Sequence, residues 1–231
     1  MLDIWRINFA DFFNILALNN YLNQEEQVKS LKFIKEIDKN NYIKSHAMLR
    51  IILSSYLDIA PGLIEFECNE FFKPKLAKKY ESKFYFNLSH TKTCAYVIVS
   101  TSENCGIDVE DFKNKIKINV RIMDMILSQE EKNNFYNAKK QKELFFTYWT
   151  LKEAYLKAKG TGFLENPRKI DFSSICKESK PQQSFTLKQD KYFSYNLKDK
   201  TFLSFVILDQ IKPIQPRFCS AIEFYKLQQE C

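Results

Sequence analysis

The sequence has no run of apolar residues long enough to cross a bilayer as a helix, which takes about 18 residues. Its amino-terminal segment, M-L-D-I-W-R-I-N-F-A-D-F-F, places an acid at Asp3 and lacks a basic stretch followed by an apolar core and a small-residue cleavage site. We therefore expect no membrane partner and no secretory signal. The expected compartment is the cytoplasm.

Histidine is scarce and closely spaced cysteine pairs are absent. His46 and His90 are the two histidines, and none of the six cysteines lies at C-x-x-C spacing. This pattern argues against a zinc site and favours free thiols in a reducing compartment. Because no G-x-S-x-G motif occurs either, a serine hydrolase with a Ser-His-Asp triad is not expected.

Arginine supplies only five of the 35 basic residues, which argues against bidentate guanidinium recognition of bases or phosphates. The 28 acidic residues still leave a net charge of +7, which favours an anionic partner: a nucleic acid, a nucleotide or an acidic protein. Apolar side chains are abundant, with 21 Phe and 12 Tyr among 231 residues. The composition is that of a globular protein with one large domain or two small ones.

Apolar periodicity predicts helices followed by strands, twice along the chain. Helices are expected over 24–39, 42–57, 123–127 and 143–159, with a capping box at Ser128 and Glu131 and a stop at Gly160. Strands are expected over 64–67, 84–88, 95–100, 105–110, 170–172, 184–188, 192–197, 202–208 and 218–224. This order predicts an α+β protein of two similar halves, 1–102 and 103–231, without a supporting sequence repeat.

The segment G-I-D-V-E at 106–110 places Asp108 and Glu110 on one face of a strand, about 6.6 Å apart along the backbone. Any half-buried edge strand shows such alternation, but a paired carboxylate set also suits a hard divalent cation that keeps positions open for phosphate. In the second motif, W-T-L-K-E-A-Y-L-K-A-K-G-T-G at 149–162, helical spacing puts Trp149, Glu153 and Lys157 on one face. An exposed Glu-to-Lys pair is the plain alternative, and the tryptophan on the same stripe favours a packed, functional face.

The third motif is F-N-L-S-H at 86–90, where a strand runs into a polar turn that offers a hydroxyl and an imidazole. A structural turn and a phosphate-binding turn both fit Ser89 and His90. Together, in their order and spacing, the three motifs resemble the signature of the 4′-phosphopantetheinyl transferases, in particular the two-domain type of the surfactin synthetase activator. Phe72-Lys73-Pro74 is similar to the lysine-proline element of that family, and Arg50 stands where its members often have arginine. The resemblance covers roughly residues 40–165.

The resemblance implies a duplicated fold with its active site where the halves meet. It also implies transfer of the phosphopantetheine arm of coenzyme A to a serine of an acyl- or peptidyl-carrier protein, releasing adenosine 3′,5′-bisphosphate. Asp108, Glu110 and Glu153 are then the expected Mg²⁺ ligands, with Glu153 also the general base. Lys157 would stabilise the diphosphate. The nucleotide end of coenzyme A is expected at Lys73, Ser89 and His90, with the 3′-phosphate near His90 and Arg50 a weaker candidate.

The apolar residues between the acidic strand and the long helix 143–159 could receive the carrier protein or belong to the core. They are Phe112, Ile116, Ile118, Val120, Met123 and Met125. We expect a monomer that binds no nucleic acid. Two other functions remain open on the residues alone: a Mg²⁺-dependent phosphohydrolase or nuclease using the same carboxylates, and a non-catalytic module that binds single-stranded nucleic acid through lysines and aromatic rings.

Overall fold

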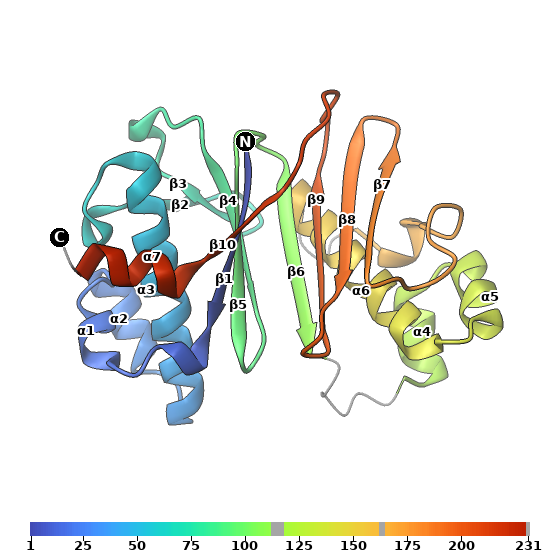
Figure 1. Cartoon of the computed structure of the whole chain (residues 1–231), viewed down its shortest axis with the longest axis horizontal. Coiled ribbons are helices and arrows are strands. Elements are labelled where there is room, and N and C mark those ends of the chain that lie inside the picture. Colours follow the sequence, from blue (N-terminus) through green and yellow to red (C-terminus); the bar gives the residue numbers. More distant parts are fainter. Residues whose placement is uncertain (112–117, 162–164, 230–231) are drawn as a thin grey trace. The chain divides into compact units, whose positions relative to one another are not determined.

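The computed structural model describes residues 1–111, 118–161 and 165–229 (Figure 1). The chain forms two compact units. Met1–Cys68, Pro74–Thr101 and Gln215–Cys231 make up unit 1, and Asn69–Lys73 and Ser102–Ile214 make up unit 2. Both units combine helices with strands, so the α+β class predicted from the sequence is confirmed.

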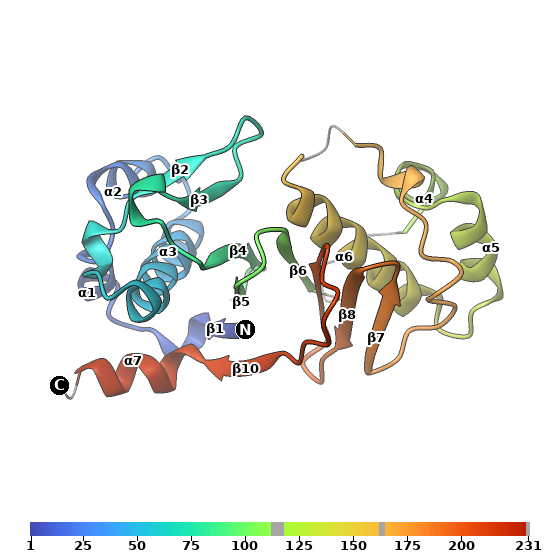
Figure 2. The ribbon, with the colours of Figure 1, turned by 90° about the horizontal axis from the view of Figure 1, so that it is seen from above.

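Unit 1 contains a four-stranded sheet in the order β10-β1-β5-β4. Its strands are β1 (Leu2–Asn8), β4 (Tyr85–His90), β5 (Cys94–Ser100) and β10 (Arg217–Ser220). β1 runs antiparallel to β5 and parallel to β10, so segments from opposite ends of the sequence lie side by side (Figure 2). A separate antiparallel pair is formed by β2 (Phe66–Cys68) and β3 (Pro74–Leu76).

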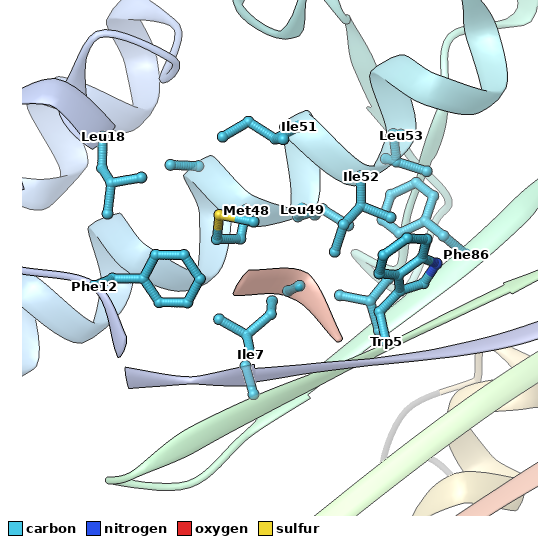
Figure 3. Packing of buried hydrophobic residues seen from close by; sticks show 14 of the residues in the cluster. Trp5, Ile7, Phe12, Leu18, Met48, Leu49, Ile51, Ile52, Leu53 and Phe86 are labelled. Atoms are coloured by element: carbon cyan, nitrogen blue, oxygen red, sulfur yellow. The ribbon is translucent and has the colours of Figure 1, made fainter. Parts of the chain in front are cut away.

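The helices of unit 1 are α1 (Ile15–Asn19), α2 (Gln24–Ser30), α3 (Glu36–Leu57) and α7 (Ala221–Gln229). Apolar residues of α1, α3 and α7 join the core of this unit, whereas α2 contributes none to it. Within the core, Met48 and Ile52 of α3 lie opposite Ile7 and Trp5 of β1 (Figure 3). All four side chains are buried, and burial of such residues contributes roughly 1.5–3 kcal/mol each to folding. The core thus fixes α3 against the strand that begins the chain.

Unit 2 contains a second four-stranded sheet, in the order β6-β9-β8-β7, with antiparallel pairing throughout. Its strands are β6 (Cys105–Asp111), β7 (Gln182–Leu187), β8 (Asp190–Asn196) and β9 (Thr201–Ile207). Its helices are α4 (Val120–Ile126), α5 (Gln129–Asn137) and α6 (Gln141–Lys159). α6 packs against β6, β9 and β8, which brings two of the sequence motifs together (Figure 1).

Several expected elements differ from the structure. β1 was not expected, because its residues are buried on both faces and show no strand alternation. The segment 170–172 is not a strand, and the expected strand 218–224 is a short strand followed by α7. The division into 1–102 and 103–231 has a linear boundary, whereas residues 215–231 return to unit 1 because β10 pairs with β1. Such a long-range pairing leaves no local pattern in the sequence.

Of the helices in the described ranges, none is both long and apolar enough to cross a membrane.

Candidate active site

The two predicted carboxylates of β6 lie on the face of the strand that packs against α6. Asp108 is buried and Glu110 is partly buried, while Ile107 and Val109 alternate with them and are buried on the opposite face. The contact with α6 is close because the strand carries Gly106 there: a Cβ atom at this position would lie 2.1 Å from the carbonyl oxygen of Ala154. The missing side chain therefore allows the acidic strand to touch the helix.

The helix α6 carries the other predicted residues of the site. Trp149, Glu153 and Lys157 are partly exposed at a spacing of four residues, while the positions beside them are buried. The predicted common stripe is therefore present. The helix ends where predicted, with Gly160 in the left-handed conformation (φ 69°) as its cap.

An ion pair joins the two elements, with Nζ of Lys157 2.7 Å from Oδ1 of Asp108. Burial, and after it the charge of Asp108, raise the pKa of Glu153 to about 7 against the opposing effect of Lys157. The pKa of Glu110 also rises to about 7, first through burial and then through the negative charge of Asp108, with smaller contributions from Glu153 and Asp111. Three acids thus share a site in which one lysine supplies the balancing charge.

This donor set fits a hard divalent cation in its chemistry, since carboxylate oxygens are the ligands that Mg²⁺ prefers. The pKa values of Glu110 and Glu153 are raised first by burial and then by repulsion from Asp108, and a bound cation would oppose both effects because it favours the charged carboxylates. Among the residues that the structure describes, no three His, Cys, Asp or Glu side chains are gathered into a ready metal cluster. The site therefore offers suitable ligands that are not yet arranged around one point.

Lys73 also belongs to unit 2, at the end of the turn 69–73. Its ammonium donates hydrogen bonds of 3.1 Å to the carbonyl oxygens of Cys105, the first residue of β6, and Ala158, in the last turn of α6. An ammonium has three N–H groups, so two of them serve the protein backbone.

Ser89 and His90 end strand β4 in unit 1, with the hydroxyl buried and the imidazole exposed. Near them lies His46 of α3, whose ring stacks on Tyr42 with centroids 3.9 Å apart. Burial chiefly lowers the pKa of His46 to about 4; the hydrogen bond with the carbonyl oxygen of Tyr42 opposes this, and the positive charges of Lys29, His90 and Arg50 add to it. This end of unit 1 therefore gathers basic groups around a half-buried, neutral imidazole, and these basic groups suit an anionic ligand.

Arg50 is a structural residue in this arrangement. Its side chain is 0% exposed, and it donates to Oε2 of Glu26 at 2.6 Å and to the carbonyl oxygens of Pro61 and Ile64. The guanidinium also lies over the ring of Phe66. A group buried in this way cannot meet coenzyme A without rearrangement, so we do not retain Arg50 among the coenzyme contacts.

The six apolar residues considered for carrier binding divide into three groups. Phe112 and Ile116 lie outside the described residues. Met123 is 5% exposed and belongs to the core of unit 2, because α4 turns this side chain inward, and Ile118 packs against the same core. Val120 and Met125 are 62% and 63% exposed. Of the two alternatives that the sequence leaves open, the core is therefore the one that holds for Met123, and the exposed pair is Val120 with Met125.

Two functional features escaped the sequence analysis. Asn69 donates to the carbonyl oxygen of Gly160 at 2.9 Å, and it lies four residues before Lys73 of the lysine-proline element. Gly106 is the first residue of the motif G-I-D-V-E, and a glycine inside a strand is a recognised signal of close backbone approach. Both residues lie where β6 and α6 meet, and neither carries chemistry of its own.

Comparison with known proteins gives matches along both halves of the chain. Residues 5–104 match the family described as 4′-phosphopantetheinyl transferase, N-terminal, and residues 104–211 match the 4′-phosphopantetheinyl transferase superfamily. The chain is 33% identical over 144 residues to the 4′-phosphopantetheinyl transferase HetI of Nostoc sp., which covers 61% of this chain and 60% of the relative. It is 26% identical over 183 residues to the 4′-phosphopantetheinyl transferase gsp of Aneurinibacillus migulanus, covering 78% and 70%.

A mammalian relative shows the same kinship at greater distance. The L-aminoadipate-semialdehyde dehydrogenase-phosphopantetheinyl transferase of Mus musculus is 25% identical over 184 residues, covering 71% of this chain and 59% of the relative. The alignment with HetI spans about three fifths of that protein's length. The two adjoining family matches, together with the motifs placed on β4, β6 and α6, identify the chain as a member of the 4′-phosphopantetheinyl transferase superfamily.

Proposed function

We propose that this protein transfers the 4′-phosphopantetheine arm of coenzyme A to a serine hydroxyl of an apo acyl- or peptidyl-carrier protein. Adenosine 3′,5′-bisphosphate would be the second product. The observation that supports this most directly is the contact of β6 with α6, which joins Asp108 to Lys157 and places Glu110 and Glu153 within electrostatic reach. Attack on a diphosphate requires acids that can hold a cation and accept a proton, and a positive group near the phosphates; the three acids and Lys157 are groups of these kinds.

Glu153 is our candidate for the general base that takes the proton of the carrier serine. A carboxylate whose pKa lies near 7 is well suited to accept a proton at neutral pH, because about half of it is ionised there and the ionised form is still basic. Mg²⁺ held by Asp108, Glu110 and Glu153 would supply positive charge to the diphosphate. Lys157 would add a fixed positive charge beside the same oxygens.

The nucleotide end of coenzyme A would be held by Ser89 and His90, with the 3′-phosphate near His90. The basic groups around His46 support this assignment, since Lys29 and His90 both act on that ring through their charge. Lys73 has one N–H group that is not used by the carbonyl oxygens of Cys105 and Ala158, and we assign it a single contact to the coenzyme.

The carrier protein would dock on the exposed side of α4. Val120 and Met125 are large apolar side chains in solvent, and such residues gain from a partner that covers them. We predict that the double variant Val120→Ser/Met125→Ser raises the KM for the carrier about thirtyfold and leaves the KM for coenzyme A within twofold, each apolar anchor being worth about 1 kcal/mol. The measurement is steady-state kinetics with each substrate varied in turn.

A matched control for this prediction is Ile211→Ser. Ile211 is 74% exposed in the same unit but lies in the segment after β9. Its variant should keep the KM of the unaltered protein. An unchanged carrier KM in the α4 variant would contradict the docking site.

We further propose a monomer that acts in the cytoplasm and has neither nucleic-acid nor membrane partners.

The reaction is tested by incubating the protein with coenzyme A, Mg²⁺ and an apo acyl-carrier protein, followed by intact mass measurement of the carrier. We expect a mass gain of one phosphopantetheine that is lost in EDTA and in Glu153→Gln. Glu143→Gln is the matched control, because Glu143 is an acid in the first turn of the same helix. A folded protein that modifies no carrier, and instead releases phosphate from coenzyme A or nucleotides, would establish the phosphohydrolase alternative.

A further inference from the structure

The turn 69–73 is held by its own hydrogen bonds. Oδ1 of Asn69 accepts from the backbone N–H groups of Phe71 and Lys73 at 2.9 and 2.8 Å, and the backbone N–H of Asn69 donates to the carbonyl oxygen of Lys73. Phe72 at the tip has φ 62°, a conformation that is uncommon for a bulky residue. A turn that fixes such a conformation is rigid, so its side chains act from a defined base.

This turn caps the carboxyl end of α6. The last carbonyl groups of a helix have no partner within the helix and carry partial negative charge. Lys73 donates its ammonium to the carbonyl oxygen of Ala158, and Asn69 donates its amide to that of Gly160. A side chain at Gly160 would press on both groups, since its Cβ would lie 2.9 Å from Nδ2 of Asn69 and 3.1 Å from Cδ of Lys73.

The same ammonium reaches the acidic strand. Nζ of Lys73 donates to the carbonyl oxygen of Cys105 at 3.1 Å, so one group binds the start of β6 and the end of α6. The contact at Gly106 lies one residue further along the strand. Asp108 follows three residues after Cys105, and Lys157 precedes Ala158 by one residue. Any loosening at Lys73 would therefore separate the two partners of the Asp108–Lys157 ion pair.

We propose that Lys73 is a positioning residue, which together with Asn69 ties β6 to the end of α6 and thereby sets the distance between the acids of the strand and Glu153 and Lys157. This inference rests on the proposed transferase function. It assigns the main role of Lys73 to the protein backbone and only a minor one to coenzyme A. Burial, which lowers the pKa of Lys73, agrees with an ammonium that serves internal acceptors.

The test compares Lys73→Met, which keeps the aliphatic stem and removes the donors, with Lys159→Met. Lys159 lies at the same helix end, but it pairs with Glu165 and is not among the donors to β6. For Lys73→Met we expect kcat for carrier modification to fall about tenfold or more, because small displacements of reacting groups are costly, while the Kd for coenzyme A by calorimetry rises by no more than about fivefold, the cost of the single contact. Lys159→Met should behave as the unaltered protein.

Asn69→Ala supplies an independent variant of the same turn. It should lower kcat to a similar extent, and the double variant with Lys73→Met should lose little more than either single variant, because both act through one connection. Amide hydrogen exchange gives a readout that needs no turnover: exchange at Gly160, whose N–H donates to the carbonyl oxygen of Leu156, should accelerate about tenfold in Lys73→Met while amides of β8 keep their rates.

Three results would overturn the proposal. A large rise in the Kd for coenzyme A would show that Lys73 is mainly a coenzyme ligand. An unchanged kcat in a folded variant would show that Lys73 only stabilises the fold. Multiplicative losses of kcat in the double variant would show that Lys73 and Asn69 act independently. The unaltered protein distinguishes these from failure of the proposed function. If the unaltered protein modifies no carrier at all, the transferase assignment fails. Amide exchange then tests the structural part by itself: an unchanged exchange rate at Gly160 in Lys73→Met would show that Lys73 does not hold the end of α6.

Discussion

Glu153 determines the acid–base behaviour expected of the site. Because burial and Asp108 raise its pKa to about 7, its ionised form should dominate only above neutral pH. In the metal-free protein, the carboxyl carbon of Glu153 should therefore titrate near pH 7 in ¹³C NMR, well above an ordinary glutamate. Addition of Mg²⁺ should move this titration to lower pH, since a cation favours the charged form. A titration near 4.5 in the metal-free protein would contradict the crowded site.

Glu110 gives a second prediction at this scale, on stability. Its pKa is about 7 in the folded chain and about 4.5 as an ordinary glutamate, so the folded state binds the proton more tightly. This contribution to stability is complete below pH 4.5 and is lost as pH rises through 7. We expect Glu110→Gln to raise Tm by a few degrees at pH 8 and by less at pH 5, without Mg²⁺. Equal shifts at the two pH values, measured by calorimetry, would refute this explanation.

At the scale of elements, α6 is fixed by an internal ion pair as well as by its apolar face. Lys152 lies 2.5 Å from Glu131 of α5 and donates to the carbonyl oxygens of Ile126, at the end of α4, and Pro167. Both side chains are at most 1% exposed. Lys152→Met should lower the free energy of unfolding by about 3–5 kcal/mol, because it leaves Glu131 charged and buried without its partner.

The matched variant is Lys152→Met with Glu131→Gln, which removes both charges. It should recover a substantial part of the lost stability, as judged by urea unfolding. If the double variant were no more stable than Lys152→Met, the ion pair would not be the cause. Neighbouring residues of α6 point to different faces of the helix. Lys152 is buried in the ion pair with Glu131, whereas Glu153, the next residue, is partly exposed and belongs to the acidic site.

Elements with strong local signals could be predicted from the sequence. The end of α6 at Gly160, the capping box at Ser128 and Glu131, and the strand carrying Asp108 all agree with the structure, because each depends on residues close in sequence. The stripe of Glu153 and Lys157 was predictable for the same reason. The inward position of Met123 was not, since α4 has only seven residues and its orientation is set by packing rather than by periodicity.

At the scale of the whole chain, long-range pairing limits what the sequence can predict. The two strands β1 and β10 are separated by some 200 residues and pair only in the folded protein. Asp3 of β1 is buried there and accepts two hydrogen bonds from Arg217, at 2.9 and 2.6 Å, and one from Tyr56. The ion pair between Asp108 and Lys157 is a similar case, because 48 residues separate them in the sequence. The motifs indicate that both residues belong to the site, but they do not indicate that the two side chains are in contact.

Net charge is the property of the whole molecule that leads to a kinetic prediction. The excess of 35 basic over 28 acidic residues should attract an acidic carrier protein and increase the rate of encounter. With coenzyme A kept saturating, kcat/KM for the carrier should fall about tenfold between 50 and 500 mM NaCl, because the screening length shortens to a few ångströms. The value of kcat at saturating carrier should change little, since encounter no longer limits the rate. A carrier with its surface acids replaced by amides should show a much weaker dependence on salt, and equal dependence for the two carriers would show that salt acts on the enzyme itself rather than on their attraction.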